Sequence, residues 1–319
     1  MKGQKIVSII RMLALLLFLA SGALQTARAQ NSEKSLAEKL GFARSAKILI
    51  VHADDVGMTH SVNAATVKAL DSGLVNSASI MVPCPWFPEI ADYAQSHPEV
   101  DFGLHLTLTS ERVYYRWGPV APRDKVPTLV DANGYFHHDW SADTRIDPRD
   151  AELELRAQID RAYAMGVHPT HLDSHQYRLI LNGKPLFDAF LRVAHSYKLP
   201  AFVTRDWFAD SPYLEPSLTR DDIVLDHTVT ISPSVRSEKW ADFYEAALKN
   251  LQPGVTEFVI HVATADDEMK AATRERDTWG AAWRQRDFNF FTSPQFREML
   301  DRYNVKLTTW RQLSTVSRH

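Results

Sequence analysis

The sequence predicts an α/β fold built on a mostly parallel sheet, and three observations lead to this prediction. Strand-like and helix-like segments alternate along nearly the whole chain from Lys47, the first strand-like segment is an almost continuous apolar run, and polar residues gather where predicted strands end. Repeated strand–helix units favour parallel pairing, because each helix carries the chain back to the end of the sheet where the next strand starts. The alternation by itself allows either a closed barrel or an open, doubly wound layer.

The first half of the chain contains three of these predicted strands. Residues 47–52 are almost all apolar, as expected for a strand that is buried on both faces. Residues 60–72 carry apolar side chains at helical spacing, and Gly73 stands just past the predicted helix end. The next predicted elements are a strand at 77–82, a helix at 89–95 and a strand at 101–107.

The second half begins with a strongly amphipathic helix at residues 148–165. Asp147 is its expected N-cap, Pro148 takes the first helical position, and Gly166 ends it. Strands follow at 169–173, 201–204, 257–262 and 306–307, with helices at 184–196, 239–251 and 294–303. The irregular segment 110–147 is long for a loop inside a compact domain, so we expect it to form a lid or the wall of a binding site.

The N-terminus is typical of a secretory signal peptide. Lys2, Lys5 and Arg11 lead into the apolar run 12–20, and Ala27-Arg28-Ala29 is a small-x-small cleavage site. The run is much shorter than the ~20 residues that span a bilayer, so we expect cleavage and export to the periplasm or the exterior, without stable membrane insertion; an uncleaved anchor is the alternative. The predicted division is a signal peptide at 1–29, an N-terminal segment at 30–46 and a single α/β domain at 47–319.

The composition limits the class of protein. The chain is 45% hydrophobic and 24% charged, which is ordinary for a soluble globular protein. A net charge of −3 argues against a nucleic-acid-binding protein, which normally shows a basic excess. Cys84 is the one cysteine, so no disulfide can form within the chain, and its setting Val82-Pro-Cys-Pro-Trp86 indicates a structural turn rather than a catalytic thiol.

Two sets of polar residues follow predicted strands in the first half of the chain. Asp54 and Asp55 come directly after the strand at 47–52, and two adjacent carboxylates at a buried strand end require a cation or hydrogen bonds to offset their desolvation. The alternative is a helix N-cap beside one exposed acid. His105 lies in the strand at 101–107, where a lone histidine can also be an ordinary core residue.

Two further sets lie in the second half. The run His171-Leu-Asp173-Ser-His175 places two imidazoles and a carboxylate within five residues at a strand end, and this combination suits Zn²⁺ and similar divalent ions. A polar turn is the alternative. His261 ends the strand at 257–262 and is weak by itself. Since active residues gather at the carboxyl ends of parallel strands, all four sets are candidates for one site.

Together these residues give the sequence a resemblance to the YdjC-like (ChbG-type) carbohydrate deacetylases. The resemblance covers about residues 47–313 and implies a distorted TIM-type (β/α) barrel related to polysaccharide deacetylases, with the catalytic barrel at 47–319. The motifs that carry it are Ala53-Asp-Asp-Val-Gly57, Asn63, Gly73-Leu-Val-Asn-Ser-Ala78, Gly103-Leu-His105-Leu106, His171-Leu-Asp-Ser-His175 and Phe291-Thr-Ser-Pro-Gln-Phe296.

The resemblance also implies roles for individual residues. Asp55, His105 and His175 would hold one divalent metal, Asp54 would be the general base, and His261 the general acid. The family metal is Mg²⁺, although two imidazoles and a carboxylate are equally a Zn²⁺ set. The implied substrate is an acetylated mono- or oligosaccharide, and the enzyme could be a homo-oligomer.

Several positions depart from the family or stay open. Tyr177 stands where the family often has a histidine, so we expect it to influence substrate choice, and Val262 follows His261 where proline is commoner. His171 either supports a metal ligand by a hydrogen bond or competes with His175 for the metal, and we expect the first role. Arg205 either orients Asp54 or binds substrate, unless it simply pairs with a surface acid.

Two other functions fit the sequence. A metal-independent glycosidase would use Asp54 and Asp173 as its carboxylate pair. A carbohydrate-binding protein without turnover would keep the barrel and the sugar contacts alone. The segment Tyr114-Tyr-Arg-Trp117 with Tyr135-Phe136 would suit stacking on sugar rings, or it packs into the core.

Overall fold

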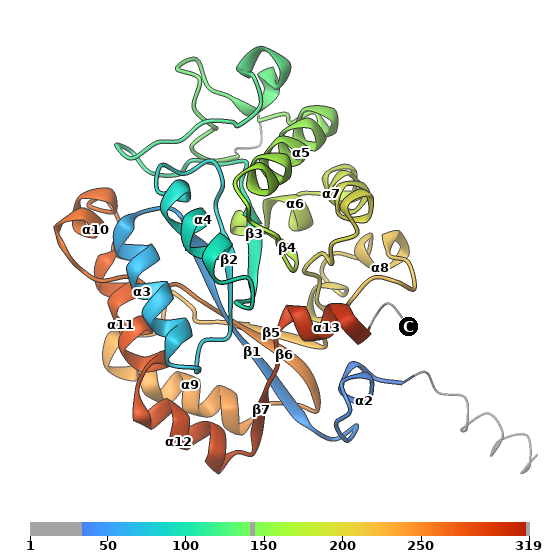
Figure 1. Cartoon of the computed structure of the whole chain (residues 1–319), viewed down its shortest axis with the longest axis vertical. Helices are drawn as coiled ribbons and strands as arrows, with labels where there is room; N and C mark the ends of the chain where they lie inside the picture. Colours follow the sequence, from blue (N-terminus) through green and yellow to red (C-terminus); the bar gives the residue numbers. More distant parts are fainter. Residues whose placement is uncertain (1–33, 141–143, 317–319) are drawn as a thin grey trace, which may run out of the picture.

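A curled sheet of parallel strands forms the centre of the molecule (Figure 1). The computed structural model describes residues 34–140 and 144–316, so the predicted signal peptide at 1–29 lies outside the described residues. The strand order is β4-β3-β2-β1-β6-β5, with β7 also paired to β1. The strands are β1 Lys47–Val56, β2 Ser77–Ile80, β3 Phe102–Leu106, β4 Leu172–Ser174, β5 His227–Thr230, β6 Gly254–Ile260 and β7 Val305–Leu307.

Isolated pairings link the two ends of this sheet. Leu172 of β4 pairs with Ala201, and Thr204 pairs with Leu225, which leads into β5. The predicted strand at 201–204 is therefore wrong in extent, since only these two bridges form: Thr204 already caps the 3₁₀ helix Arg205–Trp207. The prediction of a distorted (β/α) barrel is confirmed, with its weakest pairing between β4 and β5.

Strand β1 is the axis of the fold. All of its residues after Lys47 are buried, which explains the continuous apolar run in the sequence. One edge of β1 pairs with β6, and the other edge is shared by β7 and β2. Asn76 holds this junction: its Oδ1 accepts from the Val51 N–H at 2.8 Å, and its Nδ2 donates to the Thr308 carbonyl at 2.6 Å.

Helices surround the sheet (Figure 1). The cap predicted for α5 is confirmed, because Asp147 accepts from the Arg149 N–H and Pro148 begins the helix. None of the helices in the two described ranges is long and apolar enough to cross a membrane. The longer helices are α3 His60–Asp71, α4 Phe87–Ser96, α5 Pro148–Ala164, α7 Lys184–Tyr197, α9 Trp240–Lys249, α11 Ala281–Phe291, α12 Pro294–Arg302 and α13 Trp310–Val316, and the short ones are α2 Leu36–Lys39, α6 Arg178–Leu181, α8 Leu214–Ser217 and α10 Asp267–Ala272.

Helices α11 and α13 and strand β5 were absent from the sequence prediction. The buried face of α11 includes Arg284 and Asp287, so the apolar periodicity that marks a helix is broken. Strand β5 is only half-buried and follows a loop, and its sequence His227-Thr-Val-Thr230 has a single aliphatic residue.

Candidate active site

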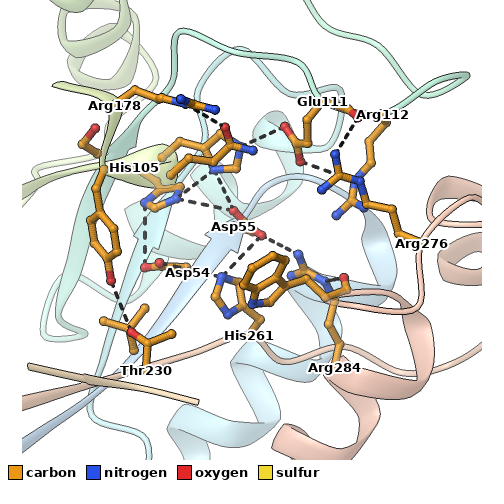
Figure 2. Close-up of a pocket in the computed structure, with 16 residues that line it drawn as sticks. Asp54, Asp55, His105, Glu111, Arg112, Arg178, Thr230, His261, Arg276 and Arg284 are labelled. Carbon is orange, nitrogen blue, oxygen red and sulfur yellow. Dashed lines mark hydrogen bonds and ion pairs between the residues drawn. The ribbon is translucent and has the colours of Figure 1, made fainter. Parts of the chain in front are cut away.

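A cavity of about 360 Å³ opens where β1, β3, β4 and β6 end (Figure 2). Asp54 and Asp55 enter it from the end of β1, His105 from β3, and His175 from the residue after β4. His261 follows β6 and lines the opposite wall. The structure thus brings together the five residues to which the resemblance gave metal-binding or catalytic roles.

Three of these residues point one atom each at a common centre. Asp55 Oδ1 lies 3.4 Å from His105 Nε2 and 3.3 Å from His175 Nδ1. The two imidazole nitrogens are 3.2 Å apart. All three residues are buried, and Asp55 Oδ1 makes no hydrogen bond within the described part of the chain. Asp55 reaches this position with a φ of +67°, a left-handed conformation that is uncommon for a non-glycine residue.

Carboxylates behind the two histidines determine which nitrogen faces the centre. His105 Nδ1 lies 2.7 Å from Asp173 Oδ1, and His175 Nε2 lies 3.0 Å from Glu111 Oε2. Each carboxylate accepts a hydrogen bond from the N–H of its histidine, which leaves the lone pair of the other nitrogen directed inward. Three inward lone pairs on buried atoms repel one another unless a cation lies between them, so this donor set fits a divalent metal ion.

The other carboxylate oxygen of Asp55, Oδ2, is hydrogen-bonded to Arg284. The guanidinium of Arg284 donates to Asp55 Oδ2, and both side chains are almost fully buried. Burial alone would raise the pKa of Asp55, but the positive charge of Arg284 opposes it, and the pKa lies well below its ordinary value. Asp55 is therefore a carboxylate with one oxygen satisfied and one directed at the centre.

Asp54 occupies a different position from its neighbour. Its Oδ1 lies 3.2 Å from His52 Nε2 and accepts from the Ser79 hydroxyl at 3.3 Å. Its Oδ2 faces the cavity, 3.9 Å from His261 Nε2. Asp54 is thus free of the three-atom centre but adjacent to it, as a base that acts on a water molecule there would be.

A backbone hydrogen bond fixes the position of His261, and its surroundings determine the charge of its ring. The backbone N–H donates to Asp287 Oδ2 at 3.0 Å, which ties the end of β6 to α11. Burial, with the positive charge of Arg284, lowers the pKa of His261 to about 4, so the ring is neutral near pH 7 in this state.

His171 does not compete with His175. It lies deeper in the barrel, where its ring stacks on Trp310 at 4.9 Å and meets the edge of His52 at 5.1 Å. His52 in turn contacts Asp173 at 3.1 Å and Asp54, so His171 packs behind the groups that hold the site. A Cβ atom at Gly103 would collide with the His171 ring, which accounts for glycine in the motif of β3.

Arg205 lies outside the cavity and makes the contact with a surface acid that the sequence left open as the alternative. It lies in an exposed 3₁₀ helix, 3.8 Å from the surface acid Asp226, and it does not line the cavity. The strand-end position that suggested a role belongs to a segment that turns away after Thr204. Arg284, by contrast, contacts the active-site carboxylate of Asp55.

Of the other residues predicted to contact substrate, Tyr177 lines the cavity, whereas the aromatic segment lies outside the cavity lining. Tyr177 lines the cavity, and its hydroxyl lies 3.4 Å from the Thr230 hydroxyl. In the aromatic segment, Trp117 and Phe136 are core residues, whereas Tyr114 is 69% exposed, outside the cavity lining.

Sequence reasoning missed several residues of the site. Glu111 and Arg112 lie in the irregular segment after β3, where nothing in the local pattern marks them. Arg276, Trp279 and Arg284 come from the segment around α11, which carried no strand-end signal. His52 could have been noticed as a polar residue inside an otherwise apolar strand.

Comparisons with known proteins show which proteins the chain resembles. Residues 48–302 match the family described as YdjC-like protein. A carbohydrate deacetylase of Thermoanaerobacter pseudethanolicus is 31% identical over 235 residues, which is 70% of this chain and 84% of that protein. A carbohydrate deacetylase of Thermus thermophilus is 31% identical over 288 residues, 86% of this chain and 97% of that protein. The solved structure of an Enterococcus faecalis protein named for cellobiose-phosphate cleavage is 27% identical, with a TM-score of 0.71 over 84% of this chain and 99% of that one.

Proposed function

We propose, from the premise that this chain belongs to the YdjC-like protein family, that it is a metal-dependent hydrolase that removes acetyl groups from an acetylated carbohydrate. The observation that carries the proposal is the convergence of three buried, inward lone pairs from Asp55, His105 and His175 beside the base candidate Asp54. The names of the relatives supply the substrate class.

The protein residues divide the chemistry among themselves. A divalent cation held by Asp55, His105 and His175 would polarise the acetyl carbonyl and lower the pKa of a water molecule. Asp54 accepts the proton of that water, whose hydroxyl adds to the acetyl carbon. Asp54 passes this proton to the neutral His261, 3.9 Å away, and the imidazolium so formed delivers it to the departing nitrogen or oxygen as its bond to the acetyl carbon breaks. The products are acetate and a free amine or hydroxyl on the sugar.

The experiment is acetate release from a panel of acetylated mono- and oligosaccharides, with and without a chelator. We expect release that chelation abolishes and added metal restores. Asp54→Asn should lower kcat by about 10²–10⁴-fold while metal still binds. Arg205→Gln is the matched control, since it removes a charge from an exposed residue outside the cavity. Full activity in the presence of a chelator, or no release from any sugar, would reject the proposal.

A metal-independent glycosidase is disfavoured by the position of Asp173. Its Oδ1 is engaged by His105 and its Oδ2 by His52, and the residue does not line the cavity. A binding protein without turnover predicts sugar affinity with no acetate produced, and the same panel distinguishes it.

We further propose that the metal is Mg²⁺, with Zn²⁺ as the alternative, and that the chain is exported. The metal follows from the family resemblance, and export follows from the predicted leader at residues 1–29. Metal analysis of the purified protein tests the first, and fractionation of expressing cells tests the second. Metal content dominated by neither ion, or a full-length chain retained in the cytoplasm, would contradict them.

A further inference from the structure

A buried histidine behind the cavity has two carboxylates at one of its nitrogens. His52 lies in the middle of β1, is fully buried and does not line the cavity. Its Nε2 lies 3.1 Å from Asp173 Oδ2 and 3.2 Å from Asp54 Oδ1. Two carboxylate oxygens so close to a bare lone pair would be repelled, so Nε2 must carry a hydrogen that both acids face.

Other contacts of the ring fix the direction of this N–H. His52 Nδ1 lies 2.9 Å from the Ser77 hydroxyl, and the His171 ring packs edge to face against His52 with the ring centres 5.1 Å apart. The Ser79 hydroxyl lies 3.0 Å from Nε2 and donates to Asp54 Oδ1 at 3.3 Å, so it supports the same carboxylate oxygen. The ring cannot turn away from the acids without the loss of hydrogen bonds in a fully buried place.

The two acids lead to different parts of the site. Asp54 is the base candidate, and its Oδ1 contacts set the angle at which Oδ2 faces the cavity. Asp173 instead holds a metal ligand, since its Oδ1 lies 2.7 Å from His105 Nδ1. Among the described residues, the Asp173 carboxylate is hydrogen-bonded to His52 and His105 alone. One N–H thus connects the group that accepts the proton of water with the group that orients a metal ligand.

We propose that His52 is a positioning residue of the reaction, whose single N–H orients the base Asp54 and, through Asp173, the metal ligand His105. The inference rests on the proposed deacetylase function and adds to it a residue that touches neither substrate nor metal. Asp54 must reach a water molecule beside the three ligand atoms, so the base and the ligands have to keep a fixed separation. Because one ring holds both carboxylates, the barrel core sets that separation before substrate enters.

The test replaces His52 by Leu, which keeps apolar bulk, and by Gln, whose amide N–H reaches about as far as Nε2. In His52→Leu at saturating metal, kcat for acetate release should fall about 10–100-fold, because the base is misplaced. KM should change by less than about threefold, since no substrate contact is lost. The affinity of the metal-free protein for Zn²⁺, measured by competition with a chromophoric chelator, should fall about tenfold. His52→Gln should recover most of both losses.

Two second substitutions separate positioning from a general loss of packing. Added to Asp54→Asn, His52→Leu should lower kcat no further but should still lower Zn²⁺ affinity. Added to Asp173→Asn, it should lower kcat but leave Zn²⁺ affinity as it is in Asp173→Asn alone, because residues that act through one another are not additive. His97→Leu is the matched control: His97 is a half-buried histidine that stacks on Tyr93 at 4.0 Å outside the cavity, and its loss should change neither quantity.

Three results would overturn the inference. They are losses of equal size in both backgrounds, a His52→Gln protein no better than His52→Leu, and a folded His52→Leu protein with kcat and Zn²⁺ affinity within about twofold of the unmodified chain. If thermal melting shows that His52→Leu does not fold, kcat is compared in the Asp173→Asn background, which has one buried charge fewer, and a loss under about twofold there overturns the inference. If no sugar releases acetate, the deacetylase proposal fails, and the Zn²⁺ measurements alone decide whether His52 acts on His105.

Discussion

Replacing Glu111 by Gln should weaken metal binding although Glu111 is not itself a metal ligand. Burial by itself would raise the pKa of Glu111, but His175 and Arg112 outweigh it and lower the pKa to about 2, so the group is a carboxylate at neutral pH. It holds the proton on His175 Nε2 at 3.0 Å and thereby presents the Nδ1 lone pair to the metal. Glutamine keeps the shape and an accepting oxygen but loses the charge.

The size of the effect follows from the kind of bond that is lost. A hydrogen bond to a charged group contributes about 1.5–3 kcal/mol, and removal of an outer carboxylate partner of a ligating histidine lowers metal affinity about 10–100-fold. This 10–100-fold loss of metal affinity equals about 1.4–2.7 kcal/mol of binding free energy. The lower half is the better expectation, because the Gln oxygen still accepts the His175 N–H and only the charge is removed.

The assay is competition for Zn²⁺ between metal-free protein and a chromophoric chelator, and Mg²⁺ binding to the same protein is measured by calorimetry. Asp139→Asn is the matched control: it makes the same carboxylate-to-amide change on an exposed residue that pairs with Arg178 and touches no ligand. Asp55→Asn should lose binding altogether, since it removes a ligand. A Glu111→Gln protein that is folded and binds within twofold of the unmodified chain would refute the argument that the carboxylate orients His175.

Three further predictions concern stability. Burial raises the pKa of Glu154 from 4.5 to about 7, so the folded state retains a proton that the unfolded chain loses. The free energy of unfolding should therefore fall by ~3 kcal/mol as pH rises from about 4.5 to about 7. Urea titrations should show this decline, and it should be absent or much smaller in Glu154→Gln. Arg284→Gln leaves the Asp55 carboxylate buried and unpaired, and should lower the free energy of unfolding of the metal-free protein by about 3–5 kcal/mol, with partial recovery when metal is added. A loss under 1 kcal/mol in urea denaturation would contradict this. Asn76→Ala removes both side-chain bonds at the junction of β1, β2 and β7 and should cost about 2–4 kcal/mol by the same measurement, with metal affinity unchanged.

The parts of the fold that the sequence predicted are those in which the local pattern and the final burial agree. Strand β1 is apolar in sequence and buried on both faces, and α5 carries its N-cap in the preceding residue. The prediction failed where the buried face is polar. Helix α11 buries Arg284 and Asp287 because they contact the site, and that use removes the apolar periodicity by which a helix is found.

The residues of the candidate site also fall into two groups, those that the sequence predicted and those that it did not. Asp54 and Asp55 come from the end of β1 and His105 from the end of β3, so the rule that active residues gather at strand ends placed them near one another in advance. Glu111 and Arg284 are brought in by a loop and by a helix 229 residues along the chain from Asp55. Partners of this kind depend on tertiary packing, and a single sequence carries no spacing from which to infer it.

The arrangement of charges around the three ligand atoms supports a site that is formed before the metal arrives. Each ligand group has its outward atom engaged by a partner of opposite character: Arg284 at Asp55 Oδ2, Asp173 at His105 and Glu111 at His175. The inward atoms are therefore fixed in direction by bonds that do not involve the metal. The left-handed φ of Asp55 costs free energy that the same bonds offset. Metal binding then requires little reorganisation of the chain, so the strength of these outer bonds, more than the three ligands alone, should determine how tightly the site holds its ion.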